Sequence, residues 1–516
     1  MSPRGPKRRT YRLNQLNAGI NTMAEESAFV TLDPSNAPSP LTQLQFEMKD
    51  QNNWAHLYRG GLSKDSGFSL HEDTGVATPI TGLGRYINSS GTSLFLYSQG
   101  TNAYKLVAGT PTSIATISSG AYTHFETAGD ELIICDGVSA PQRYNGTTTA
   151  NVGGSPPSGA RQSLYTQNRL WMFSATSNHS LLYYSDALDI NAGYSSNFVS
   201  CNVNDGQKIT GIADIFVPGE LRPLILVTKE RSIGIIDGDG SAGNPFTFIQ
   251  ISNDLGVLGF RQVIPYEQDI AFLTPKGVST YQTALKNVNF EEKFISDKVR
   301  NQFTALSQTT LPQAFSWYDW KHDQIGYAVA TGNATYPNLI WLFNIRLGAW
   351  RKKSGFNLTA GFVDTDGTFY HGDDTGKIYN HVDTVHNYNS EPIIASFQTP
   401  YLDFYEPMMD KRIVESKITV RGQGSHQLGI GCSLDYGTRI GSTHTLNLSA
   451  GNYEWGGGVW TSNSATYRWG GAPLLKQKFY PKGHFENISF TVTQSGEDEP
   501  VDIVDWVITV EEHTLT

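Results

Sequence analysis

The chain is poor in charged residues, and the sign of the charge excludes one class of protein. Charged residues make up 17% of 516 residues, and the 38 Lys and Arg are outnumbered by 48 Asp and Glu, which gives a formal net charge of −10. A protein that binds nucleic acid by neutralising phosphates needs an excess of Lys and Arg. The acidic balance therefore argues against a nucleic-acid reader.

Cysteines and long apolar runs are also scarce. The three cysteines, Cys135, Cys201 and Cys432, are too scattered for a zinc site and odd in number for a disulfide framework. We expect each to be a small buried apolar residue. No stretch approaches the roughly 18 apolar residues that span a bilayer, and no apolar signal-peptide core follows Met1. We expect no membrane span, and assembly in a reducing cytoplasm.

Glycine and aromatic residues are abundant instead. The chain has 51 Gly, and Phe, Trp and Tyr make up 12% of its residues. This composition favours short strands and tight turns over helices. The best helix candidate is Glu291–Phe303, in which Phe294, Ile295, Val299 and Phe303 have partly helical spacing, and we expect a short surface helix there.

A hairpin unit recurs along the first three quarters of the chain. Four or five apolar residues meet a Gly, Asp or Asn turn, and a second β-prone run follows. Units that start at 94, 132, 170, 224 and 271 are 38, 38, 54 and 47 residues apart. Propeller blades are about 40 to 50 residues long. Further units are Leu339–Phe343, which leads to Trp350, and Thr368–Tyr370.

The spacing favours a β-propeller, because a small blade must stack against neighbours to cover both of its faces. One or two long β-sandwiches are the alternative, since hairpins at short spacing also occur there. After Asn387–Pro392 the blade pattern ends, and alternating strands are expected at 393–397, 413–420, 428–434, 485–492 and 501–510, around a Trp- and Gly-rich excursion from Trp455 to Trp469. In 501–510, Val504, Trp506, Ile508 and Val510 form an apolar face opposite a face that includes Ile503 and Asp505.

The predicted fold class is therefore all-β, a β-propeller followed by a C-terminal antiparallel β-sandwich. The predicted domains are an N-terminal basic arm and extended segment (1–45), the propeller (46–390) and the sandwich (391–516). The arm carries Arg4, Lys7, Arg8, Arg9 and Arg12. We expect a solvated, flexible arm, the alternative being a peptide that docks on an acidic partner surface or closes the propeller.

Fragments that resemble functional loops each fail at a particular residue. Asp237–Gly240 and Asp364–Gly367 open like calcium loops, but Phe248 and Thr375 stand where an EF-hand needs a bidentate acid. Hairpin turns explain both fragments. Ser433, Asp435 and Gly437 partly match a turn of sialidase-like propellers, but the match breaks at Arg439 and Ile440.

Catalytic signatures are also missing from the sequence. It contains no G-x-S-x-G elbow, H-E-x-x-H, Walker loop or paired CxxC, and a glycosidase would need two convergent carboxylates. The histidines, including His371, His381 and His386, have no ligand-pair spacing, and we interpret them as isolated turn or surface residues. We predict a non-enzymatic protein with no catalytic residues, no cofactor and no metal.

Several stretches resemble one family. They are "NRLWMFS…LLYYSD…DGQKITGI…LILVTKERSIGIID" within Asn168–Asp237, then Leu255–Gln282, Pro392–Phe404 and Val501–His513. Together they resemble the tail hub or nozzle proteins, also called packaged-DNA stabilisation proteins, of short-tailed bacteriophages. The similarity covers roughly residues 160–516. It carries over no catalytic residue.

The resemblance implies a virion protein in a six-fold ring below the portal and adaptor proteins. Such a ring continues the DNA channel, retains packaged DNA and permits its ejection, without sequence-specific DNA binding. Tail fibre or needle proteins would be further partners, and the Trp455, Trp460 and Trp469 region would supply contact anchors or a sandwich core. The alternatives are a receptor- or carbohydrate-binding propeller module of the tail and a secreted propeller glycosidase.

Overall fold

The computed structural model describes residues 7–16, 18–22, 41–45, 47–57, 60–216, 222–282, 294–406, 408–422, 426–448 and 474–513. Nearly all regular structure in these ranges is β-strand, which confirms the predicted all-β class. The chain forms two compact units. The terminal unit comprises Met1–Phe68, Phe343–Ser354 and Val382–Thr516, and the propeller unit comprises Ser69–Leu342 and Gly355–His381. Each unit is built from separated stretches, whereas the sequence suggested three successive ranges.

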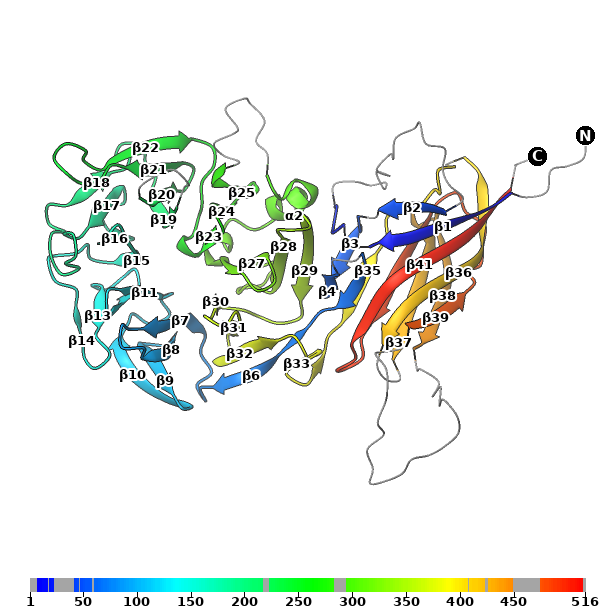
Figure 1. Cartoon of the computed structure of the whole chain (residues 1–516), viewed down its shortest axis with the longest axis horizontal. Helices are drawn as coiled ribbons and strands as arrows, with labels where there is room; N and C mark the ends of the chain where they lie inside the picture. The colour runs from blue at the N-terminus through cyan, green and yellow to red at the C-terminus, as the bar shows by residue number, and fades with distance from the viewer. Residues whose placement is uncertain are drawn as a thin grey trace, which may run out of the picture. The chain divides into compact units, whose positions relative to one another are not determined.

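The propeller unit has seven blades within the described residues, which confirms the predicted propeller. Each blade is an antiparallel meander, and the blades follow one another around a ring (Figure 1). The inner strands β7, β11, β15, β19, β23, β26 and β30 contact one another in this order, and β30 also contacts β7, so the ring is closed.

The strands of the first four blades are β7 (Ile80–Ile87), β8 (Ser93–Gln99), β9 (Asn102–Val107) and β10 (Thr110–Thr116); β11 (His124–Ala128), β12 (Glu131–Cys135), β13 (Gln142–Tyr144) and β14 (Thr149–Asn151); β15 (Ala160–Thr166), β16 (Arg169–Ser174), β17 (Leu181–Tyr184) and β18 (Phe198–Ser200); and β19 (Ile209–Ile215), β20 (Leu224–Lys229), β21 (Ile233–Asp237) and β22 (Thr247–Ser252). The remaining blades contain β23 (Val263–Tyr266), β24 (Asp269–Thr274) and β25 (Gly277–Thr280); β26 (Phe315–Asp319), β27 (Gln324–Val329) and β28 (Leu339–Asn344); and β30 (Ala360–Val363), β31 (Phe369–Gly372) and β32 (Lys377–Val382).

A strand from the N-terminal half of the chain completes the last blade. Strand β6 (Gly67–Asp73) lies beside β32, so residues before the first blade and residues after the sixth share one sheet. Just after β6, the Thr74 hydroxyl donates to the carbonyl oxygen of Gly376 at 2.8 Å. Gly376 has φ 90°, and a Cβ there would collide with Val76, so a glycine is required at this closure.

The second strand is deeply buried in most blades. Every residue of β24 is buried, as are all but the first residue of β12, β16, β20 and β27. A strand with neighbours on both sides and sheets against both faces has no solvent face, so its sequence is a continuous apolar run. The repeated runs at 94, 132, 170, 224 and 271 all fall on second strands, β8, β12, β16, β20 and β24.

The helical content is small and short. The 3₁₀ segments η1 (Phe260–Gln262), η2 (Asp297–Val299) and η3 (Leu311–Gln313) connect strands, and α2 (Arg300–Thr304) follows η2 directly. The predicted helix at Glu291–Phe303 is therefore wrong in its bounds. In the described part of that range, η2 precedes a single helical turn, and the residues before Phe294 lie outside the described ranges.

The terminal unit has two sheets that share one core. The first sheet has the order β2-β1-β41-β36-β39, and β5 pairs with both β41 and β4. The second contains, in order, β29, β3, β35, β40, β37 and β38. The strands of the whole terminal unit are β1 (Lys7–Gln15), β2 (Leu41–Gln45), β3 (Asp50–Asn52), β4 (Trp54–His56), β5 (Leu62–Lys64), β29 (Ala349–Ser354), β33 (Asn387–Tyr388), β34 (Glu391–Pro392), β35 (Ala395–Gln398), β36 (Asp410–Gly422), β37 (Gln427–Leu434), β38 (Arg439–Asn447), β39 (Leu474–Phe479), β40 (Ile488–Gln494) and β41 (Val501–His513). The 3₁₀ turn η4 (Asp435–Gly437) lies between β37 and β38.

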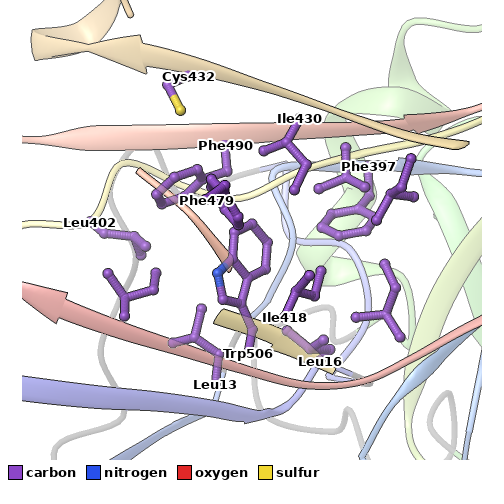
Figure 2. Packing of buried hydrophobic residues seen from close by; sticks show 14 of the residues in the cluster. Leu13, Leu16, Phe397, Leu402, Ile418, Ile430, Cys432, Phe479, Phe490 and Trp506 are labelled. Atoms are coloured by element: carbon purple, nitrogen blue, oxygen red, sulfur yellow. The ribbon is translucent and has the colours of Figure 1, made fainter. Parts of the chain in front are cut away.

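Both sheets of the terminal unit contribute buried side chains to this core. Trp506 of β41 lies among Leu13 of β1, Phe479 of β39 and Phe490 of β40 (Figure 2). The Trp506 indole donates to the Ser416 hydroxyl at 2.7 Å, which satisfies its one polar atom inside the core. The Trp- and Gly-rich excursion from Trp455 to Trp469 lies outside the described residues.

The alternation predicted for the last strand holds only in part. Trp506, Ile508 and Val510 are buried as expected, but Ile503 is also fully buried and Val504 is only partly buried. The register explains the difference, because Asp505 pairs with Thr419 whereas Ile503 pairs with the adjacent Val420. Val504 is thus an extra residue at a β-bulge, and the bulge exchanges the two faces.

The predicted flexible arm is wrong for residues 7–15, which form β1. This strand pairs antiparallel with β41 from Lys7↔Glu512 to Leu13↔Trp506. Arg8 lies 3.1 Å from Glu511, Arg9 3.1 Å from Glu512, and Arg12 3.1 Å from Asp505. The arm therefore does dock on an acidic surface, and that surface belongs to the same chain. Arg4 lies outside the described residues.

Candidate functional site

Arg261 of η1 contacts residues of several blades at one end of the propeller. Its guanidinium donates to the carbonyl oxygens of Thr359 (2.8 Å) and Gln313 (2.6 Å). It also lies 3.8 Å from the ring centroid of Tyr122 and 5.3 Å from that of Phe315. These partners precede or begin the inner strands of the second, sixth and seventh blades, while Arg261 precedes that of the fifth. A side chain that touches four blades of a seven-bladed ring must lie near its axis.

Neighbouring side chains fill the same end of the axis. The Phe260 ring packs edge-on against His124, which begins the inner strand of the second blade, with ring centroids 6.2 Å apart. Arg161 of the third blade lies 4.6 Å from the Phe260 centroid and donates to the Asp136 carbonyl oxygen at 2.9 Å. We call Tyr122, His124, Arg161, Phe260, Arg261 and Phe315 the axial cluster.

The axial cluster holds two arginines without a carboxylate partner. Within the described residues, neither Arg161 nor Arg261 forms a salt bridge. Burial lowers the pKa of Arg261 to about 10, and the nearby Arg161 charge adds to the effect, although Tyr122 opposes it. Burial also lowers the pKa of Arg161, against the attraction of Asp136. This end of the axis is therefore an electropositive centre of low solvation.

Next to the axial cluster, His124 and Glu126 lie on the same face of β11. Burial lowers the pKa of His124 to about 4, with Arg161 contributing, although the hydrogen bond to the Ser163 carbonyl opposes the shift. Burial raises the pKa of Glu126 to about 7, and Asp214 adds to this rise, while the hydrogen bond from the Tyr165 amide lowers it. Their nearest N and O atoms are 3.9 Å apart. Near neutral pH the imidazole is thus uncharged, and the carboxyl is close to its titration midpoint.

A surface pocket of about 180 Å³ opens beside the axial cluster. The residues of its wall include Arg161, Lys208, Glu230, His179, Phe173 and Phe260. The residues come from the starts of β15 and β19, the ends of β16 and β20, and the segment before η1, so the pocket lies on the face of the propeller where inner strands begin. Ligand sites are typically concave pockets in which a few polar groups converge.

The two calcium-like fragments are hairpin turns, as predicted. Asp237–Gly240 begins the β21–β22 connection, where the Asp239 carboxylate accepts the Ser241 amide at 2.8 Å and pairs with Arg222. Asp364–Gly367 joins β30 to β31. The Asp364 carboxylate pairs with Arg85 of the first blade, so this turn also ties the last blade to the first.

The sialidase-like fragment is likewise a structural turn. Asp435 begins η4 in the terminal unit, where its carboxylate accepts the Glu486 and Asn487 amides and pairs with Arg439. The cysteines are free and buried, as predicted, and burial raises the pKa of each thiol to about 12.

The prediction of isolated histidines is wrong for His371 and His381. Adjacent strands β31 and β32 bring them together, and His381 Nε2 lies 3.0 Å from His371 Nδ1. Their ten-residue separation follows from one hairpin, which spacing rules for helices do not capture. Among the described residues, no group of three or more His, Cys, Asp or Glu is placed to hold a metal ion. No helix in the described ranges is long and apolar enough to cross a membrane.

No sequence pattern predicted the axial cluster. Tyr122, Arg161 and Arg261 are separated by 39 and 100 residues and belong to no motif. The available signal was positional, because each stands just before or at the start of an inner strand.

Comparisons with known proteins return propellers at low similarity. No protein-family model and no curated protein matches the chain. Among solved structures, BamB from Moraxella catarrhalis is 12% identical, with a TM-score of 0.37, and the match covers 58% of this chain and 85% of that one. YCF48 from Cyanidioschyzon merolae is 9% identical, with a TM-score of 0.38 and coverage of 61% and 98%. The WD40 propeller domain of Doa1 is 7% identical, with a TM-score of 0.39 and coverage of 61% and 97%.

Proposed function

We propose that this chain is a non-enzymatic structural protein of a short-tailed bacteriophage virion. In this proposal, identical copies form a hub or nozzle ring in the tail, as a homohexamer that continues the DNA channel below the portal and adaptor. The ring retains packaged DNA and lets it leave at ejection. The protein is assembled in the host cytoplasm, and fibre or needle proteins are further neighbours.

One observation carries the proposal. The residues that resemble tail hub proteins fall on framework strands: Asn168–Asp237 contains β16 to β21 of two adjoining blades, and Leu255–Gln282 contains all three strands of the next blade. Because the resembling residues lie along whole strands, the resemblance is to the framework of the fold and not to a site where polar side chains converge. This pattern supports a structural role.

The axial cluster supports a channel between subunits. Arg261 and Phe260 contact residues of several blades near the propeller axis, an arrangement that speaks against duplex DNA passing through the propeller itself. A conduit would have to be enclosed by several copies of the chain. The formal net charge of −10 suits such a wall, because phosphates are not attracted to an acidic surface.

The oligomeric state tests the proposal. We expect light scattering of the full chain, alone and mixed with the adaptor and portal proteins of the same phage, to show a closed ring of identical copies. Cryo-electron microscopy of assembled tails should place the chain at the distal end of the channel. A persistent monomer that ignores the adaptor, or a lumen lined mainly by Lys and Arg, would contradict the proposal.

A receptor- or carbohydrate-binding module is the second candidate, favoured by the pocket beside the axial cluster. In that case the purified chain should adsorb to host cells and bind defined glycans on an array. Adsorption by a chain that forms no ring would favour this candidate over the hub.

A further inference from the structure

We propose that the pocket beside the axial cluster binds a small organic carboxylate that carries one negative charge. The inference stands on the propeller unit alone and does not rest on the proposed tail function. The pocket is defined by Arg161, His179, Lys208, Glu230, Phe173 and Phe260.

The charge of the wall points to an anion. Arg161 and Lys208 are the basic residues of the wall and Glu230 is its acidic residue, which leaves an excess of one basic side chain over acidic ones. Within the described residues, Lys208 makes no hydrogen bond or salt bridge, and Arg161 donates a single hydrogen bond, to the Asp136 carbonyl. Their remaining N–H groups are available to a ligand.

The axial cluster behind the pocket adds to the positive field. Arg261 and Arg161 are close enough to repel each other, and neither is neutralised by a salt bridge in the described ranges. The Nε of Arg261 is buried without a hydrogen-bond partner there. The nearest acid, Asp136, already accepts the backbone amides of Ser118, Val138 and Ser139. An anion at the pocket would therefore complement charges that the fold leaves uncompensated.

Geometry and size favour a carboxylate over a phosphate or a nucleic acid. The Arg161 guanidinium carbon lies 4.6 Å from the centroid of the Phe260 ring, and a guanidinium is a planar fork of donors that matches a planar carboxylate. Glu230 in the wall would repel a second negative charge on the ligand. A volume of about 180 Å³ suits one monosaccharide-sized molecule, and the buried residues Phe173 and Phe260 stand behind its wall.

The test uses the full chain and sodium D-glucuronate as the probe, with D-glucose as the neutral analogue and inorganic phosphate as the dianion. Binding is followed by saturation-transfer NMR and by titration at low ionic strength. We expect glucuronate to bind with a dissociation constant in the millimolar range or below, glucose not to bind measurably, and phosphate to bind more weakly than glucuronate.

Three variants separate the charges. Lys208→Gln should weaken glucuronate binding about three- to tenfold, and Glu230→Gln should strengthen it by a similar factor, because each alters one wall charge. Arg231→Gln removes an exposed cation adjacent to Glu230 but outside the wall, and it should leave binding unchanged.

All three variants change exposed or half-exposed side chains, so folding should be retained, and circular dichroism checks this. Equal binding of glucose and glucuronate, tighter binding of phosphate, or the same affinity in all four proteins would overturn the assignment. No glucuronate binding to the folded wild-type chain at tens of millimolar would do so as well. None of these results bears on ring assembly, which light scattering measures separately.

Discussion

Glu126 shows how one partly buried carboxyl makes the propeller sensitive to pH. Burial raises its pKa to about 7 from an ordinary value of 4.5, so in the folded chain it keeps its proton at pH values where the unfolded chain has lost it. The folded state then binds more protons than the unfolded state, and stability falls as pH rises from about 4.5 to about 7.

Replacing Glu126 by Gln should remove this dependence. Gln keeps the oxygen that accepts the Tyr165 amide but cannot ionise. We expect Glu126→Gln to raise the free energy of unfolding by roughly 2 to 3 kcal/mol at pH 8 and to have little effect at pH 4.5. Urea unfolding at the two pH values measures the difference.

Glu131→Gln on the neighbouring strand is the control. Glu131 forms a partly exposed ion pair with Arg143, and losing such a pair costs about 1 kcal/mol or less. If Glu126→Gln gave the same change at both pH values, the carboxyl would not titrate near neutrality in the folded chain.

At the scale of elements, the second strands of the blades were the most predictable. They are covered on both faces, so they appear as uninterrupted apolar runs such as Leu170–Phe173. The second strand of the sixth blade, β27, is equally buried but was missed. Its sequence begins with the polar Gln324, and Gly326 has no side chain because the Trp317 ring occupies the space where a Cβ would lie. The strand therefore has fewer apolar side chains than its deep burial would suggest. Strands β38 and β39 are edge strands with exposed faces, and their sequences do not alternate clearly between apolar and polar residues.

Strand β1 was missed because its charges dominate the composition. Arg8 and Arg12 are exposed, whereas Tyr11 and Leu13, on either side of Arg12, are buried. The two-residue period of a strand is present, but the partner on β41 lies almost 500 residues away.

Two neighbouring substitutions test whether β1 is docked. Leu13 is fully buried in the shared core, so Leu13→Ala should cost about 2 to 5 kcal/mol of unfolding free energy. Arg12→Ala removes only the half-exposed ion pair with Asp505, so it should cost about 1 kcal/mol or less. Chemical denaturation of both variants provides the comparison, and equal, small effects would indicate a solvated arm.

At the scale of the whole molecule, the sequence could indicate a propeller but neither its closure nor its axis. Blade spacing is a local property, and five consecutive blades produced it. Closure depends on β6 joining β32 across some 300 residues, and the axial cluster joins blades that are not neighbours in the ring. Such contacts leave no periodic signal in the sequence, because each blade contributes only one or two residues to the cluster and their residue types differ from blade to blade.

Arg261 provides the test of that long-range assembly. Arg261→Lys keeps the buried positive charge but cannot donate to both Thr359 and Gln313 while stacking on Tyr122. We expect it to lower the free energy of unfolding by about 2 to 4 kcal/mol, since hydrogen bonds from charged groups contribute roughly 1.5 to 3 kcal/mol each. Arg143→Lys, which changes the partly exposed pair of Arg143 with Glu131, should cost about 0.5 kcal/mol.

Amide hydrogen exchange reveals how far the effect of Arg261→Lys reaches. Because the guanidinium contacts the second, sixth and seventh blades as well as its own, its loss should speed exchange at the starts of β11, β26 and β30 together with β23. Faster exchange confined to the segment around η1 and β23 would mean that Arg261 stabilises only its own blade. In that case the ring would be held by contacts between adjacent blades, such as Gln162 of the third blade with the Ile212 backbone of the fourth.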